Sequence, residues 1–128
     1  MSSVKSRDTT PELSVRSAIH RMGFRYSLHD RGLAGTPDIV LNRLRKVIFV
    51  NGCFWHQHTD CAAADRPKSN REFWDNKLDE NIHRDQRNLE ILLSDGWDAL
   101  TVWECEIGNK DKLATKLLGF IDARQELD

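Results

Sequence analysis

The stretch VIFVNGCFWHQHTDC, residues 47–61, dominates the interpretation of this sequence because an apolar segment runs directly into a loop of reactive side chains. Residues 47–50 are consecutive β-forming apolar residues, which is typical of a buried strand. Residues 52–61 contain two cysteines, two histidines, two large aromatic residues and an aspartate. We therefore interpret this loop as both a metal site and part of an active site, placed at the end of a central strand.

The composition is that of one soluble globular domain spanning residues 1–128, in which we expect residues 1–8 to be flexible. Hydrophobic residues make up 39% of the chain and charged residues 30%. No apolar run reaches the roughly 18 residues that a membrane span needs, and the N-terminus lacks the apolar core of a signal peptide. Three cysteines are an odd number, which argues against a disulfide framework. We therefore expect an intracellular protein with reduced thiols and no membrane contact.

Charge is distributed unevenly along the chain. Residues 1–50 carry nine Lys/Arg and four Asp/Glu, whereas residues 51–128 carry ten and sixteen. A basic N-terminal half can face the phosphates of nucleic acid while the remainder stays acidic. The alternative is a chance imbalance over solvated faces, so charge alone does not decide between them.

Apolar residues recur at helical spacing in three segments, and strand-like patterns occupy four others. Capping residues, glycines and prolines mark the boundaries between these segments. The predicted elements, in chain order, are a helix from Thr9 or Thr10 to Met22, strands over 24–28 and 38–41, a polar hairpin turn over 42–46, a strand over 47–50, an exposed polar loop over 65–71, a helix over 74–92, a strand over 97–103 and a helix over 113–121. This order predicts an α/β fold with one sheet flanked by helices.

The cysteines and histidines of the loop have a spacing suited to zinc. Cys53, His58 and Cys61 form the pattern C-x4-H-x2-C, which can supply three ligands of a tetrahedral site. Cys105 follows a predicted strand and is a sensible fourth ligand. His56 could replace His58, because the spacing allows either. The alternative interpretation is three buried free thiols and a surface histidine.

A carboxylate and a histidine near strand ends suggest hydrolytic chemistry. Asp38 enters a buried strand, where an aspartate is costly unless it is paired or binds a cation such as Mg²⁺. His56 lies just past the next strand and can deprotonate an attacking water. Glu12 could add a second carboxylate. Each residue also has a structural alternative: Asp38 as a turn cap, Glu12 as a complement to the helix dipole, and His56 as a spare loop histidine.

Four motifs together resemble the very short patch repair (Vsr) endonucleases. They are GTPDIV at 35–40, VIFVNGCFWH at 47–56, EFW at 72–74 and VWEC at 102–105, and their order and spacing are similar from about Asp8 to Ile107. The resemblance implies a restriction-endonuclease-like α/β fold, with a mixed central sheet flanked by helices and a structural zinc. It also implies a Mg²⁺-dependent enzyme that nicks DNA 5′ to the thymine of a T·G mismatch, the product of 5-methylcytosine deamination.

The resemblance also implies roles for individual residues. Asp38 and the carbonyl of Val50 would bind Mg²⁺, His56 would be the catalytic base and Glu12 an accessory acid. The implied zinc ligands, which settle the choice between the two histidines, are Cys53, His58, Cys61 and Cys105. In the family, aromatic rings wedge into the base stack beside the mismatch, where unstacking the bases costs least. The rings that match them are Phe54, Trp55 and Trp74, for which packing in a core is the alternative, most strongly for Trp74.

Three features depart from the family pattern. Asn51 stands where many members have histidine and would act at the phosphate; asparagine can form hydrogen bonds but carries no proton charge, so the rate or pH dependence is expected to differ. The segment before Glu12 is shorter than in many members, so DNA affinity is expected to be lower unless a partner compensates. Thr59 and Asp60 lengthen the spacing to Cys61, which a loop absorbs easily.

The expected partner is double-stranded DNA with a T·G mismatch, bound by a monomer in the cytoplasm at the nucleoid. We also expect a functional link to a cytosine-5 methyltransferase and to mismatch-repair proteins. One alternative is a restriction or defence nuclease of the same superfamily with another DNA target. The other is a module that binds mismatches without cutting them, although the presence of Asp38, His56 and Glu12 together argues against it.

Overall fold

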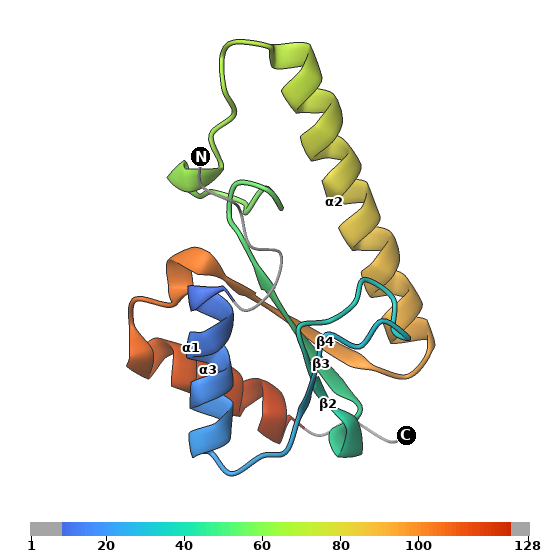
Figure 1. Cartoon of the computed structure of the whole chain (residues 1–128), viewed down its shortest axis with the longest axis vertical. Helices are drawn as coiled ribbons and strands as arrows, with labels where there is room; N and C mark the ends of the chain where they lie inside the picture. The colour runs from blue at the N-terminus through green and yellow to red at the C-terminus, as the bar shows by residue number, and fades with distance from the viewer. Residues whose placement is uncertain (1–8, 124–128) are drawn as a thin grey trace.

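The computed structural model describes residues 9–123, which form one α/β domain (Figure 1). The expectations for residues 1–8 and for the N-terminal segment concern residues outside this range. The described elements, in chain order, are α1 (Thr10–Arg21), β1 (Ser27–Leu28), β2 (Ile39–Leu41), the 3-10 helix η1 (Asn42–Leu44), β3 (Lys46–Asn51), η2 (Ala62–Ala64), α2 (Arg71–Ser94), β4 (Asp98–Trp103), η3 (Glu104–Glu106) and α3 (Lys110–Asp122).

The sheet is mixed and has the strand order β1-β2-β3-β4. The pairs β1–β2 and β2–β3 are antiparallel, whereas β3 and β4 are parallel. A parallel pair needs a long crossover, and α2 supplies it. The register pairs Asn51, the last residue of β3, with Trp103, the last residue of β4. The loops that follow these two strands therefore begin side by side at the carboxyl ends of β3 and β4, which brings residues 52–61 close to Cys105.

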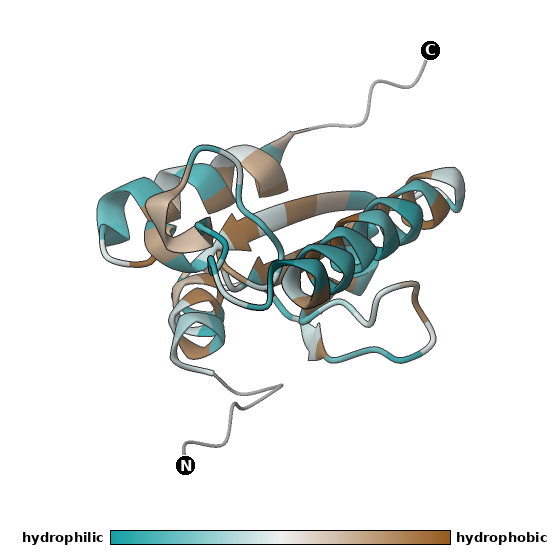
Figure 2. Ribbon diagram, turned by 90° about the horizontal axis from the view of Figure 1, so that it is seen from above, coloured by the Kyte–Doolittle hydropathy of each residue, from teal (hydrophilic) through white to brown (hydrophobic). Residues whose placement is uncertain are grey.

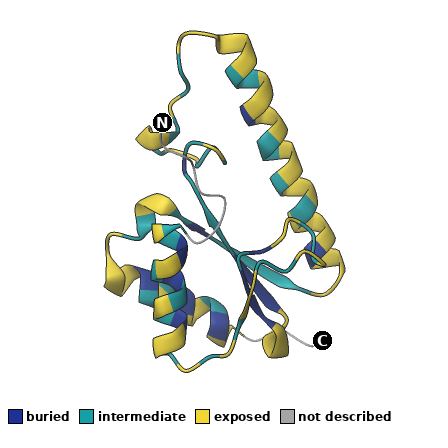
Figure 3. Cartoon of the chain, viewed as in Figure 1, coloured by how far each residue is buried: buried dark blue, intermediate teal, exposed yellow. Residues whose placement is uncertain are grey.

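Helices cover both faces of the sheet (Figure 1). Alternate strand residues serve the two faces, as the two-residue period of a strand requires. Ile39, Leu41 and Ile48 pack with α1 and α3, whereas Val40 and Val47 pack with Leu92 of α2. The buried residues gather in the strands and in the facing sides of α1 and α3 (Figure 3).

The long helix α2 is polar over most of its length (Figure 2). Leu78 and Leu92 are its buried residues, and its N-terminal half extends past the sheet toward the loop that follows β3 (Figure 1). This half therefore extends beyond the sheet, whereas the following part of the helix, within residues 82–89, lines a groove at the strand ends.

The predicted order of helices and strands is confirmed, with two corrections at strand ends. The strand predicted over 24–28 is only two residues long: Ser27 and Leu28 pair with Val40 and Ile39 of β2, and residues 24–26 lie outside the strand. Phe24 still packs against the core, whereas Leu28 is 38% exposed. Within residues 9–123, no helix is long and apolar enough to cross a membrane.

The predicted hairpin turn over 42–46 is wrong at its end. Residues 42–44 form η1, Arg45 adopts the left-handed conformation, and Lys46 already belongs to β3 and is 4% exposed. The Lys46 ammonium donates to the carbonyl oxygens of Phe120, Ile121 and Ala123 at 2.5, 3.1 and 2.5 Å. These carbonyls lie at the C-terminal end of α3, where a cation is favourable because the helix leaves them without intrahelical partners.

Candidate active site and zinc centre

A groove of about 1100 Å³ lies between four parts of the chain: the start of α1, the start of β2, the end of β3 and the helix α2. Its walls include every polar residue predicted to act in catalysis. The predicted residues are Glu12, Asp38, Asn51 and His56. Asp85 of α2 also lines the groove. Val50, predicted to offer its carbonyl to Mg²⁺, also lines the groove. Side chains from four separate segments of the chain therefore meet at the strand ends on one side of the sheet.

Two carboxylates of this groove form a compact cluster with a histidine. Glu12 is 2% exposed at the start of α1, and its Oε2 accepts hydrogen bonds from Arg16 at 2.6 Å and from His29 Nε2 at 2.9 Å. The ligand atoms of Glu12, His29 and Asp38 lie within 4.8 Å of one another. Glu12 is thus buried and paired, rather than a solvated complement to the helix dipole.

Asp38 is held in an environment that disfavours its charged form. Burial raises the pKa of its carboxyl from 3.8 to about 7, and the nearby Glu12 carboxylate acts in the same direction. The main-chain N–H of Val50, which donates to Asp38 Oδ2 at 2.7 Å, works against this rise. A bound cation would relieve the repulsion between the two carboxylates. Hard oxygen ligands in this arrangement fit Mg²⁺.

His56 is paired with an acid from α2. Its Nδ1 lies 2.6 Å from Asp85 Oδ2, and both side chains are about one-third exposed. An ionised carboxylate only accepts hydrogen bonds, so Nδ1 carries the proton and donates it. The neutral ring then has Nε2 available to accept a proton, and the Asp85 carboxylate stabilises the imidazolium that results.

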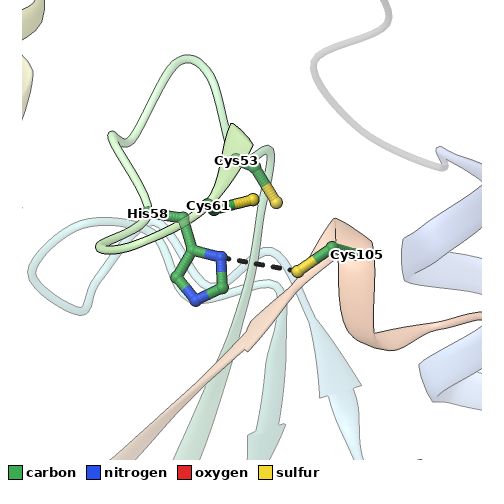
Figure 4. A group of neighbouring side chains, drawn as sticks. All are labelled: Cys53, His58, Cys61 and Cys105. Atoms are coloured by element: carbon green, nitrogen blue, oxygen red, sulfur yellow. Dashed lines mark hydrogen bonds between the residues drawn. The ribbon is translucent and has the colours of Figure 1, made fainter. Parts of the chain in front are cut away.

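The three cysteines and His58 form a second cluster (Figure 4). Cys53, His58 and Cys61 come from the loop after β3, and Cys105 comes from η3. Their ligand atoms all lie within 4.8 Å of one another, and His58 Nδ1 is 3.4 Å from the Cys105 sulfur. The structure therefore brings together all four predicted zinc ligands and places His56 elsewhere.

The chemistry of this donor set fits zinc. All three cysteines are free thiols, and three sulfurs with one imidazole nitrogen match a closed structural zinc site. Desolvation, followed by the hydrogen bond and charge of Cys53 and then of Cys61, raises the pKa of Cys105 to about 11. Crowded thiols resist ionisation unless a cation is present, and a zinc ion supplies that charge. The His58 ring also stacks on Trp103, with ring centroids 4.2 Å apart and planes 11° apart.

The predicted wedge residues form one aromatic cluster. The ring of Phe54 meets Trp55 and Trp74 edge-on, with centroids 5.1 and 5.5 Å apart, and Trp55 lies 5.8 Å from Trp74. Phe73, which is 60% exposed, extends the cluster through an edge contact with Trp74. Trp74 thus packs in this exposed cluster and not in the core of the sheet. Phe54 and Trp55 also line the groove.

A polar network attaches the loop that follows β3 to α2 beside these rings. Arg66 donates to Asp75 and Asp79 of α2 at 2.9 and 2.7 Å and to Gln57 at 2.8 Å. Gln57 in turn donates to the carbonyl of Phe54 at 2.7 Å. The loop over 65–71 was predicted to be exposed, and this is wrong for Arg66, which is half-buried because it bridges the two segments.

Sequence reasoning missed Asp85, which lines the groove, and His29, which contacts Glu12. His29 directly follows the strand predicted over 24–28, and nothing in the neighbouring sequence marks it. Asp85 had a signal: the apolar stripe Leu78, Ile82, Leu89 and Leu92 has spacings of four, seven and three residues, and Asp85 occupies the position missing from it. An acid at a stripe position faces the rest of the protein and needs a partner.

Comparisons with known proteins agree with this geometry. The family described as DNA mismatch endonuclease Vsr matches residues 1–63. The chain is 43% identical to the type II nicking enzyme V.XorIIP of Xanthomonas oryzae pv. oryzae, over 95% of this chain and 89% of that one. It is 37% identical to the DNA mismatch endonuclease Vsr of Escherichia coli (strain K12), over 92% of this chain and 75% of that one.

Among solved structures, the catalytic domain of the homing endonuclease I-Bth0305I superposes with a TM-score of 0.62 and 25% identity, covering 88% of this chain and 94% of that one. The likeness covers most of both chains, so the fold is that of an endonuclease catalytic domain. With this fold, and with relatives that are similar over most of their length, the chain belongs to the Vsr family of DNA endonucleases.

Proposed function

We propose that this protein is a Mg²⁺-dependent endonuclease that nicks DNA 5′ to the thymine of a T·G mismatch. It would act inside the cell as a monomer, after deamination of a methylated cytosine. The observation that carries the proposal is that the His56–Asp85 pair, the Glu12–Asp38 carboxylates and the aromatic cluster all border one groove. A base, a cation site and a stacking surface are the three parts that such a reaction needs.

His56 supports the hydrolytic step. With its Nδ1 proton held by Asp85, its Nε2 would accept a proton from the water that attacks the phosphorus. Asp85 is a positioning residue in this scheme, because it fixes the tautomer and orientation of the ring without contacting the substrate. Asn51, at the end of β3, would donate a hydrogen bond to the phosphate. The products would be a 5′-phosphate and a 3′-hydroxyl.

Asp38 and the main-chain carbonyl of Val50 would hold the Mg²⁺ ion, with Glu12 beside them as the accessory acid. Bound there, the ion supplies Lewis-acid stabilisation of the charge that develops on the phosphate and the leaving oxygen. The raised pKa of Asp38 supports this assignment, because a divalent cation would stabilise the ionised carboxylate that burial and Glu12 disfavour.

The aromatic cluster supports a mismatched duplex as the substrate. A mismatched step costs less to unstack than a paired step, and an inserted ring replaces the stacking that is lost. Phe54 and Trp55 border the groove, and Trp74 supports them from α2. Each stacking contact contributes roughly 1–3 kcal/mol, so removal of one ring is expected to weaken mismatch binding about tenfold or more.

End-labelled duplexes with one T·G mismatch in varied contexts, with T·A and C·G controls, provide the test. Zinc-loaded protein with Mg²⁺ is expected to cut 5′ to the mismatched thymine alone. His56→Ala should abolish nicking, and His83→Ala, an exposed histidine on the same helix as Asp85, should not. Cleavage of matched duplexes would favour the restriction-type alternative. Tight T·G binding with no cleavage in any context would favour a mismatch-binding module.

A further inference from the structure

His29 has features that its place in a loop does not explain. It follows β1 directly and adopts a left-handed backbone conformation, with φ of 48°. A non-glycine residue in this region costs on the order of 1 kcal/mol, and such strain persists where surrounding contacts enforce it. Its side chain is only 12% exposed. Both the backbone and the side chain of His29 are therefore held in place by specific contacts.

Those contacts reach the two carboxylates of the groove by different routes. The His29 side chain donates from Nε2 to Glu12 Oε2 at 2.9 Å, since an ionised carboxylate can only accept. The His29 main-chain N–H donates to the main-chain carbonyl of Asp38 at 3.2 Å. One residue thus connects the start of α1 with the start of β2, the two segments that carry Glu12 and Asp38.

We propose that His29 is a positioning residue for the cation site, which holds Glu12 and Asp38 close enough to act on one ion. Arg16 cannot perform this task, because it lies on the same helix as Glu12, one turn away. Arg16 can neutralise the Glu12 carboxylate, but it does not fix α1 relative to β2. His29 contacts Glu12 and also the segment before β2, and its proximity lowers the pKa of Asp38.

This inference rests on the proposed function for the identity of the ion, but it makes a claim about cation affinity that does not depend on DNA cleavage. Removal of the imidazole takes away the contact that ties Glu12 to the segment before β2, so the ion loses part of its preorganised site. One hydrogen bond of this kind, made to a charged group, corresponds to about a tenfold change in an equilibrium constant.

The test compares His29→Ala, His29→Gln and His20→Ala, a matched removal of an exposed histidine on α1. Mn²⁺, a spectroscopic substitute for Mg²⁺, is titrated into zinc-loaded protein without DNA and followed by electron paramagnetic resonance. Single-turnover nicking of the T·G duplex is then measured against Mg²⁺ concentration, and duplex binding is measured without Mg²⁺.

For His29→Ala we expect about tenfold weaker Mn²⁺ binding and a similar rise in the Mg²⁺ concentration for half-maximal nicking, with duplex affinity unchanged. His29→Gln keeps a side-chain N–H donor and is expected to recover most of the loss. Unchanged Mn²⁺ affinity in His29→Ala would overturn the inference. So would equal losses in both variants together with a lower melting temperature, because that result indicates only structural support. If the wild-type protein cuts no T·G duplex, the proposed function fails while the Mn²⁺ titration still decides this inference.

Discussion

Asp38→Asn is expected to stabilise the protein while it abolishes nicking. Burial raises the pKa of the Asp38 carboxyl from 3.8 to about 7, so the folded state binds this proton more tightly than the unfolded state. The contribution of the group to stability is therefore lost as the pH rises from about 4 to about 7, and the full cost of the buried charge applies above pH 7. Asparagine is neutral at every pH, and its side-chain oxygen can still accept from Val50.

The size of the effect follows from the pKa difference of about three units, at 1.36 kcal/mol for each unit. At pH 8 the buried carboxylate costs up to about 4 kcal/mol, and at pH 5 the cost falls to about 2 kcal/mol, because the folded protein then keeps its proton. The free energy of unfolding of the variant should exceed that of the wild type by up to these amounts. The gap should therefore be larger at pH 8 than at pH 5.

Urea unfolding followed by tryptophan fluorescence measures this gap, with zinc-loaded protein in buffers free of Mg²⁺ and chelators. Mg²⁺ at ten times its dissociation constant should then stabilise only the wild type, by about 1.4 kcal/mol. Glu90→Gln, which removes an exposed carboxylate of α2, should show neither effect. If Asp38→Asn is less stable than the wild type at pH 8, or if the gap does not grow with pH, Asp38 does not hold an uncompensated charge and the argument for its cation site is wrong.

Three further predictions test other parts of the structure. Asp85→Asn should keep the fold but lower the single-turnover nicking rate by roughly 10²–10⁴-fold, because His56 loses the partner that sets its tautomer; a wild-type rate would contradict the role of the pair. Cys105→Ser should reduce zinc to well below one ion per chain in elemental analysis and lower the melting temperature, and full zinc content would show that another ligand completes the site. Lys46→Met should lower the free energy of unfolding in urea by about 2–4 kcal/mol, because the carbonyls at the end of α3 lose a charged donor; an unchanged value would show that water replaces the ammonium fully.

Much of the fold was predictable because it depends on local patterns. The Thr9-Pro11-Glu12 start of α1, the continuous apolar run of β3 and the stripe of α2 each specify an element without reference to the rest of the chain. Three zinc ligands were also local, because C-x4-H-x2-C lies within one loop. Cys105 could be proposed only because it follows a strand, and the parallel register of β3 and β4 is what brings it to the loop.

The residues that were missed act across the fold. Asp85 is one of several acids on a charged helix, and it becomes the partner of His56 only because α2, the crossover from β3 to β4, passes beside the loop that follows β3. His29 becomes important only where β1 ends beside α1. Lys46 looked like a turn residue, yet it is buried because α3 ends above it. Partnerships between segments that are remote in the sequence leave no spacing pattern, so a single sequence does not reveal them.

The loop over 52–61 carries both the predicted zinc ligands and the proposed catalytic histidine. Cys53 is its only buried residue, and Gln57 and Asp60 adopt left-handed conformations that cost on the order of 1 kcal/mol each. Such a loop lacks the apolar burial to hold its own shape, so a metal is the natural source of its order. Ligands at positions 53 and 58 enclose residues 54–56, which carry two wedge rings and His56. We therefore expect zinc binding to set the conformation of the proposed wedge rings and of His56 together, and the Asp85 pair to orient His56 alone.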